Sequence, residues 1–184
     1  VERTPLQELY IYFNFIDFLK KIIIRILLKT LYRTADVIIA NSKKTAKDIT
    51  NFSGKRAIEI YPPSFKKIYK FKKKRNKILS ILSVGRLSKE KGYDILIKSI
   101  AEIKFKNFKL IIVGDGPEKN KLKELAHKVG IEKKIFFVGE KKNVYKFFKN
   151  CDVFVNSSLF EGFPNVVVEA LSFGVPVICS DSHG

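Results

Sequence analysis

The sequence predicts an α/β fold in which a parallel β-sheet is flanked by helices on both faces. Between residues 78 and 180, short apolar runs that are almost free of charge recur along the chain, as expected of strands buried on both faces. Segments with helical periodicity separate these runs, an alternation typical of βαβ units. A hydrophobic content of 46% supplies enough apolar side chains for a packed core.

The chain ahead of this region begins with a long apolar segment, residues 9–31. It carries several charged residues, so a transmembrane span, which needs about 18 or more apolar residues, is disfavoured. Lys21, Arg25 and Lys29 recur every four residues and would lie along one helical face. Two interpretations stay open: a basic amphipathic helix on an anionic membrane surface, or a core helix with one solvated face.

Two short strands and a helix are expected next. An apolar run at 35–40 predicts a strand, and Ser42 is a suitable N-cap for a helix over 43–51. A second strand is predicted over 57–61, where two consecutive prolines would end it.

The best domain boundary is a basic stretch, residues 64–77, which holds eight lysines or arginines and no acidic residue. We therefore expect one domain over 1–62, a basic linker over 63–77 and a second domain over 78–184. Within the second domain, strands are predicted at 78–84, 110–113, 135–138, 153–156 and 175–180, and helices at 93–103, 117–129, 144–150 and 165–173.

The composition restricts the classes of partner and site. The formal net charge of +18 is compatible with an anionic membrane, an anionic small substrate or nucleic acid. Lysine far outnumbers arginine, which favours compositional bias with mild membrane attraction over a nucleic-acid reader. The only cysteines, Cys151 and Cys179, show no metal-binding spacing, and His127 and His183 are the only histidines. We expect no metal site, no disulfide framework and a reducing, cytoplasmic location.

Ligands of parallel sheets bind at the carboxyl ends of the strands, so the residues that follow each predicted strand are candidates for the site. After the first strand, a glycine-started loop carries Arg86 and Lys91 and leads into a helix. Two cations beside a helix start could hold a pyrophosphate, although a solvated basic turn has the same composition. Arg86 is a stronger candidate for a functional residue than Lys91, because only six arginines occur in the chain.

The next strand is followed by the turn Gly114-Asp115-Gly116-Pro117-Glu118, which resembles half of a dinucleotide-binding fingerprint. Lys119 stands where the third glycine would be, so we reject a hydride-transferring dinucleotide enzyme. The turn is interpreted as mostly structural.

The segment after the strand at 153–156 carries two carboxylates eight positions apart, Glu161 and Glu169. Gly162 and Pro164 between them favour a loop followed by a helix that begins near Pro164. Both carboxylates and the free N–H groups of the helix would then face one small volume, suited to a ligand with hydroxyls and a phosphate. A solvated loop carboxylate and a partner for the helix dipole are the alternatives.

The sequence blocks SVGRLSKEKG, GDGPE and EGFPNVVVEALSFGVPVI occur in this order. Together they resemble the retaining glycosyltransferases of family 4, which have the GT-B fold with Rossmann-like sheets, and most of all the bacterial enzymes that build lipid-linked or surface polysaccharides. The blocks ADVIIANSKKTAKDI and EIYPP are similar to the end of that family's acceptor-binding N-terminal domain. The resemblance covers roughly residues 31–184.

The resemblance implies transfer of a sugar from a nucleotide-sugar donor, such as a UDP-hexose or a UDP-N-acetylhexosamine, to a glycan or lipid-linked acceptor. The anomeric configuration would be retained, with no cofactor and no obligatory metal. Catalytic roles would fall to Arg86, Lys91 and Glu161. The implied donor-binding residues are Gly85, Arg86, Lys91, Gly139, Glu161, Gly162, Phe163, Pro164, Asn165, Val166 and Glu169.

Each of these residues has an implied role. Arg86 and Lys91 would hold the donor diphosphate and stabilise it as it leaves. Glu161 would contact sugar hydroxyls and Glu169 the ribose. The backbone N–H groups around Pro164, Asn165 and Val166 would cap the phosphate, and the loop after Gly139 would seat the base.

Departures from the family pattern make the chain a candidate fragment. Residues 1–62 are too few for the family's acceptor domain, and its glycine-rich donor loop is missing. The chain starts at Val1, lacks methionine and stops just after a strand-like run, before the family's closing helices. The alternative function is therefore an inactive fragment that binds only the donor, or a basic module peripheral on the inner face of the plasma membrane, without nucleic acid as a partner.

Overall fold

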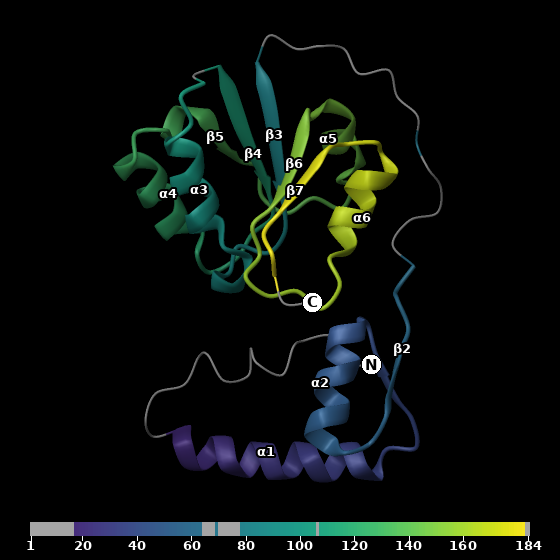
Figure 1. The fold of residues 1–184 in the computed structure, drawn as a ribbon. Helices are drawn as coiled ribbons and strands as arrows, with labels where there is room; N and C mark the ends of the chain where they lie inside the picture. Colours follow the sequence, from purple (N-terminus) through teal and green to yellow (C-terminus); the bar gives the residue numbers. More distant parts are fainter. Residues whose placement is uncertain (1–16, 64–68, 70–77, 106, 183–184) are drawn as a thin grey trace. The chain divides into compact units, whose positions relative to one another are not determined.

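The computed structural model describes residues 17–63, 69, 78–105 and 107–182 (Figure 1). In chain order the elements are α1 (Asp17–Thr34), β1 (Ile38–Ala40), α2 (Lys43–Ser53), β2 (Ala57–Glu59), β3 (Leu79–Val84), the 3₁₀ helix η2 (Lys89–Lys91), α3 (Tyr93–Ala101), β4 (Phe108–Val113), α4 (Lys119–Lys128), the 3₁₀ helix η3 (Glu132–Lys134), β5 (Ile135–Phe137), α5 (Tyr145–Asn150), β6 (Val153–Asn156), α6 (Asn165–Ser172) and β7 (Val177–Cys179).

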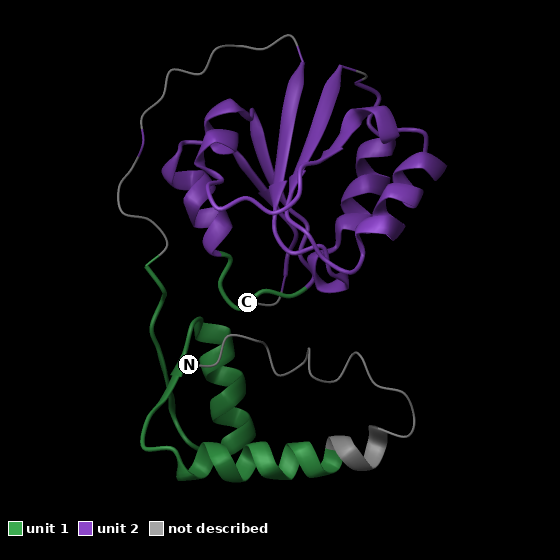
Figure 2. Cartoon of the chain, turned by 180° about the vertical axis from the view of Figure 1, so that it is seen from behind, with its two compact units in different colours: residues 1–63, 160–164, 183–184 green, residues 64–159, 165–182 purple. Residues whose placement is uncertain are grey.

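The chain divides into two compact units, which are coloured separately in Figure 2. Unit 1 comprises residues 1–63, 160–164 and 183–184, and unit 2 comprises residues 64–159 and 165–182. Apart from Pro63 and Tyr69, the predicted basic linker lies outside the described residues.

Unit 2 is built on a five-stranded sheet in the order β5-β4-β3-β6-β7, and every pairing in it is parallel. The register aligns Val84 with Val113 at the ends of β3 and β4. The chain first extends the sheet in one direction, from β3 to β5, and then returns to the other side of β3 with β6 and β7. This reversal is the topological switch point, where open α/β sheets bind ligands between the strand ends.

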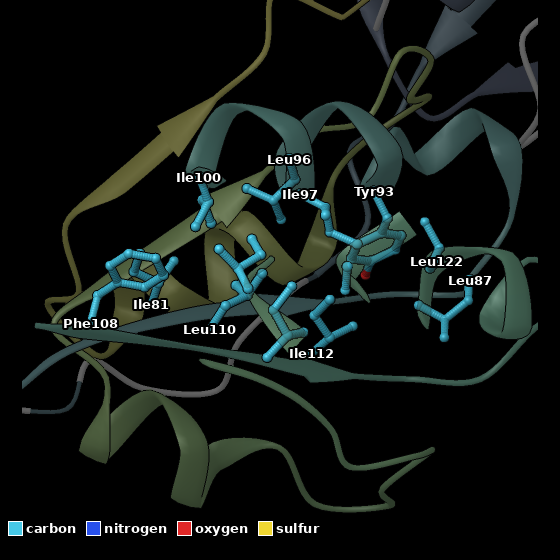
Figure 3. Close-up of a cluster of buried hydrophobic side chains, with 13 residues drawn as sticks. Ile81, Leu87, Tyr93, Leu96, Ile97, Ile100, Phe108, Leu110, Ile112 and Leu122 are labelled. Carbon is cyan, nitrogen blue, oxygen red and sulfur yellow. The ribbon is translucent and has the colours of Figure 1, made fainter. Parts of the chain in front are cut away.

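Two apolar clusters show that helices cover both faces of this sheet. On one face, Ile81 of β3 and Leu110 of β4 pack against α3 and α4, through side chains such as Ile97 (Figure 3). On the opposite face, Leu82 and Phe154 pack against α5 and α6. Successive residues of β3 thus serve different cores, as the alternation of side chains along a strand requires. The predicted α/β fold with a helix-flanked parallel sheet is confirmed.

Tyr69 lies well inside the predicted basic linker and is one of the described residues. It packs on the rest of unit 2. Its N–H donates to the carbonyl of Ser172 at 2.7 Å, and its ring stacks on Phe173 with centroids 4.1 Å apart.

In unit 1, β1 and β2 form a two-stranded parallel sheet, with Ile39 paired to Ile58. Helix α2 packs on one face of this pair through a small core, Ile38, Ala40, Ala46, Ile49 and Ala57. The predicted N-cap is observed, since Ser42 Oγ accepts a hydrogen bond from the N–H of Thr45.

Helix α1 contacts α2 through two arginines that remain exposed. The guanidinium of Arg25 lies 5.7 Å from the ring centroid of Phe52, and Arg33 Nε donates to the carbonyl of Ser53 at 3.2 Å. Isoleucines and leucines of α1 are exposed as well: Ile22, Ile23, Ile24, Ile26, Leu27 and Leu31. Of the helices in the described part of the chain, none combines the length and the apolar character needed to cross a membrane.

Candidate functional site

A cavity of about 430 Å³ lies in unit 2 at the carboxyl ends of β3 and β4. It is lined by Val84, Gly85, Arg86, Val113, Gly114, Asp115, Glu140, Lys141 and Val144. These residues come from the segments that follow β3, β4 and β5, as the strand-end rule predicts. Apolar walls with one arginine at the end of a buried strand suit a ligand that combines a flat apolar group with an anion.

The backbone around Arg86 is held by the glycine-rich turn after β4. The N–H of Gly85 donates to Val113 at 3.0 Å, the N–H of Leu87 donates to Asp115 at 2.9 Å, and the N–H of Glu118 donates to Leu87 at 3.0 Å. This ladder fixes the direction in which the loop leaves β3. Arg86 itself is exposed at the cavity, where its guanidinium is available to an anionic ligand.

Glycines make this close approach of the two backbones feasible. A Cβ at position 114 would lie 1.9 Å from the carbonyl oxygen of Gly85, and one at position 116 would lie 2.4 Å from that of Leu87. Lys119, which replaces the third fingerprint glycine, pairs with Asp115 at 2.6 Å. This hydrogen bond and the one from the Gly116 N–H lower the pKa of the exposed Asp115. The interpretation of the turn as structural is supported, and the turn also lines the cavity.

The loop that carries Lys91 is tied to the segment after β6. Ser157 Oγ donates to the carbonyl of Lys91 at 2.9 Å, and the N–H of Leu159 donates to Glu90 at 2.8 Å. Gly92 adopts φ 59° in the left-handed region, and a Cβ there would lie 2.2 Å from the Ser157 carbonyl oxygen. The segments after β3 and β6 are therefore locked together across the switch point.

The side chain of Lys91 approaches Gly85, the residue that precedes Arg86. A Cβ built at Gly85 would be 3.9 Å from Lys91 Cδ and 3.1 Å from the hydroxyl of Tyr93. Gly139 is joined to the same group, because its carbonyl accepts from the N–H of Gly114 at 2.9 Å. The structure thus brings Gly85, Arg86, Lys91 and Gly139 together at one edge of the sheet.

Helix α6 supplies Asn165, Val166 and Glu169 to unit 2. Asn165 and Val166 form its first turn, and Pro164, which precedes it, has no N–H. The Glu169 side chain is partly buried, and this burial raises the pKa of its carboxyl. A carboxylate kept in a partly desolvated place is suited to accept hydrogen bonds from ligand hydroxyls.

Residues Glu161, Gly162, Phe163 and Pro164 belong to unit 1, so the structure does not place them with the residues of unit 2. Within unit 1, the ring of Phe163 packs on Tyr61 with centroids 5.5 Å apart and planes tilted by 52°. Residue spacing alone carried no signal for this contact. The strand-end rule, by contrast, would have found Asp115, Glu140, Lys141 and Val144, which also line the cavity.

We expect Glu169→Gln to stabilise the protein near neutral pH. A raised pKa means that the folded state binds this proton more tightly than the unfolded state. The resulting stability is present below the ordinary pKa of a glutamic acid and is lost as the pH rises through the raised value. Glutamine does not ionise, so the variant does not lose this stability as the pH rises. Thermal melts between pH 4 and 8 should show a higher Tm for the variant at the upper end, whereas the exposed Glu124→Gln should leave the Tm unchanged.

Residues 64–184 match the family model described as "Glycosyl transferases group 1". The chain belongs to this family. Among its relatives is the uncharacterized glycosyltransferase MJ1059 of Methanocaldococcus jannaschii, with 38% identity over 83% of this chain and 41% of the relative. Another is a Campylobacter jejuni protein named as a diphospho-undecaprenol 4-alpha-N-acetylgalactosaminyltransferase, with 34% identity over 98% of this chain and 50% of the relative.

Solved structures of glycosyltransferases share the fold. The lipopolysaccharide outer core galactosyltransferase WaaB superposes with a TM-score of 0.67 at 29% identity, over 82% of this chain and 44% of WaaB. HepE of Anabaena, solved with UDP-glucose, gives a TM-score of 0.76 at 24% identity, over 87% of this chain and 49% of HepE. The α/β architecture is that of GT-B glycosyltransferases. This group 1 chain spans about half the length of the relatives it matches.

Proposed function

We propose that this group 1 chain binds the UDP-sugar donor of a retaining glycosyltransferase of family 4 and contributes the donor half of its active site. The observation that supports the proposal is the cavity at the ends of β3 and β4, in which Arg86 lies beside apolar walls at the switch point of the sheet. The acceptor in this proposal is a glycan or a lipid-linked saccharide, which is the kind of acceptor named for the Campylobacter relative.

In the proposed complex the diphosphate lies against Arg86, Lys91 and the first turn of α6. These cations and N–H groups would neutralise the charge that develops as the nucleoside diphosphate leaves, which is the main catalytic demand of the reaction. The base would lie against Val84, Val113 and Val144, which line the cavity. The carboxylate of Glu169 would accept the ribose hydroxyls.

Glu161 completes the proposal as the residue that contacts the donor sugar, with Gly162, Phe163 and Pro164 shaping the loop that carries it. Its contact would become important in the oxocarbenium-like state, when charge builds up on the sugar ring.

Fixed cations replace a metal in this scheme. Donor binding is therefore expected to be unchanged, within about twofold, when EDTA replaces added Mg²⁺, as calorimetric titration with UDP would show. A loss of binding on chelation would contradict the metal-free scheme.

The test of the function is titration of the chain with UDP, UDP-glucose and UDP-N-acetylglucosamine. Saturable binding that is weakened by Glu169→Gln supports the proposal. A hydrogen bond to a charged group contributes about 1.5–3 kcal/mol, so the loss should be roughly tenfold to a hundredfold. The control Glu124→Gln removes an exposed charge of the same type and should bind as the wild type does. Absence of saturable binding to all three compounds would overturn the proposal.

The alternative is a donor-binding module without transferase activity. It predicts the same binding to UDP but no release of free sugar or transfer to any acceptor. A transfer assay with a lipid-linked acceptor, in which the anomeric configuration of the product is read by NMR, separates the two.

The membrane role predicted for residues 9–31 stays a prediction, and residues 9–16 of that segment lie outside the described residues.

A further inference from the structure

The carbonyl group of Gly85 lies at a crowded point between the segments that follow β3 and β4. A Cβ at position 114 would lie 1.9 Å from the carbonyl oxygen, so the glycine there leaves room for it. The Tyr93 hydroxyl donates a hydrogen bond to the same oxygen, with the two oxygen atoms 3.3 Å apart. The peptide unit that joins Gly85 to Arg86 is therefore held through its carbonyl by a side chain of α3.

Tyr93 is itself held firmly in place. It is the first residue of α3 and is 3% exposed, and its ring packs in the apolar cluster that also contains Ile112 (Figure 3). Gly92, directly before it, packs so closely on Ser157 that a Cβ would lie 2.2 Å from the carbonyl oxygen. A phenylalanine would fill the same space in the core, so the packing of the ring does not explain the hydroxyl. A buried tyrosine hydroxyl usually has a hydrogen-bond partner, and here it is the backbone that leads into Arg86.

The hydrogen bond from Tyr93 fixes a part of the loop that the backbone ladder does not reach. The N–H groups of Gly85 and Leu87 are held by β4 and the turn after it. Neither of these two bonds sets the rotation of the peptide unit between Gly85 and Arg86, whose carbonyl points to Tyr93. Because a peptide unit is planar, the direction of its carbonyl fixes its N–H as well. The direction in which the Arg86 side chain leaves the backbone follows from that plane.

We propose that Tyr93 is a positioning residue of the donor site: its hydroxyl fixes the peptide unit between Gly85 and Arg86 and so aims the Arg86 guanidinium at the donor diphosphate. The inference rests on the proposed function, because it assigns a phosphate to Arg86. Tyr93 contacts no atom of the donor in this scheme. A separation of 3.3 Å is long for a hydrogen bond between two oxygens, and such bonds of active sites often tighten when the ligand binds.

The same hydrogen bond closes the loop that carries both cations of the site. It joins position 93 to position 85, with Arg86 near one end of the enclosed segment and Lys91 near the other. The aliphatic part of Lys91 already approaches this closure, since a Cβ built at Gly85 would lie 3.9 Å from Lys91 Cδ. Tyr93 therefore holds the two ends of the loop together. A site whose binding groups are fixed before the ligand arrives has less ordering to do on binding.

The test compares UDP with uridine, which has the same base and ribose but no phosphate, in calorimetric titrations of the full chain. Tyr93→Phe keeps the ring in the core and removes the hydroxyl. It should weaken UDP binding by about threefold to tenfold, the effect of one ordinary hydrogen bond, and uridine binding by less than about twofold. In the Arg86→Ala background the same substitution should change UDP affinity by less than about twofold, because the group that Tyr93 positions is gone.

The matched control is Ile100→Val, which trims a buried side chain of the same helix and the same core. It should leave both affinities within about twofold of the wild type, and circular dichroism with urea unfolding shows that both variants are folded during the titrations. Unchanged UDP affinity in Tyr93→Phe, equal losses for UDP and uridine, or the same loss in the Arg86→Ala background would overturn the role of Tyr93 while the wild type still binds UDP. A wild type that does not bind UDP would overturn the proposed function, and this role with it.

Discussion

Arg86→Ala should lower the affinity for UDP by roughly tenfold to a hundredfold. Arg86 is the cavity-lining cation that directly follows β3, on a backbone whose neighbouring N–H groups, those of Gly85 and Leu87, donate to Val113 and Asp115. Loss of a charge-assisted hydrogen bond to a phosphate weakens the free energy of binding by about 1.5–3 kcal/mol. In an assembled, active enzyme the same substitution should lower kcat by about 10²–10³, since the guanidinium would stabilise the leaving diphosphate. Isothermal titration with UDP and a transfer assay measure the two effects.

The control for this prediction is Lys89→Ala. Lys89 is exposed in the same loop and its loss changes the net charge by the same amount, so general electrostatic attraction falls equally in both variants. Lys89→Ala should bind UDP within about threefold of the wild type, and Arg86→Lys should fall between the two because an ammonium lacks the bidentate geometry. Equal losses in Arg86→Ala and Lys89→Ala would show that the basic charge as a whole, rather than Arg86, attracts the nucleotide.

Gly92→Ala should be among the most destabilising single-methyl changes in unit 2 and should also remove UDP binding. The residue has φ 59°, which costs a residue with a Cβ about 1–2 kcal/mol. The new Cβ would also meet the Ser157 carbonyl oxygen at 2.2 Å, and relief of such overlap costs about 1–3 kcal/mol more. The loop with Lys91 would have to separate from the segment after β6. Urea unfolding followed by circular dichroism measures the stability.

Gly130→Ala separates the two costs. Gly130 has φ 73°, but a Cβ there would meet nothing within 4 Å. It should lose only the conformational part, about 1–2 kcal/mol, and should keep UDP binding. If the two alanine variants unfold at the same urea concentration, the close packing of Gly92 on Ser157 does not stabilise the protein, and the proposed lock between the loops is wrong.

The sequence was sufficient for the fold of unit 2 because its strands are buried on both faces and its helices have one apolar stripe. Both patterns are local. The run around Leu82 therefore predicts a strand, and the run around Ile97 predicts a helix, without any tertiary information. The strand-end rule also predicted the edge of the sheet at which the site lies: Arg86 lines the cavity there, and Gly139 accepts a hydrogen bond from Gly114 in the neighbouring turn. The short 3₁₀ helices η2 and η3 were not predicted, because a three-residue turn has no periodicity to read.

The remaining differences come from contacts between residues far apart in the sequence. The grouping of residues 160–164 with unit 1 depends on neighbours such as Tyr61, and no spacing rule connects positions 61 and 163. For α1, the stripe of Lys21, Arg25 and Lys29 left open a membrane-surface helix or a core helix with one solvated face, and it did not predict a particular aromatic partner. In the structure, arginine at this face stacks on Phe52, a contact that a planar guanidinium makes readily.

The packing of Tyr69 changes where unit 2 can be cut from the rest of the chain. Its ring lies on Phe173 with planes only 15° apart, and its N–H holds the carbonyl of Ser172 at the end of α6. A protein that starts at Leu79 would therefore expose Phe173 and release the last turn of the helix that carries Glu169. An isolated unit 2 should begin ahead of Tyr69, so that the basic stretch contributes an anchor to the helix of the site.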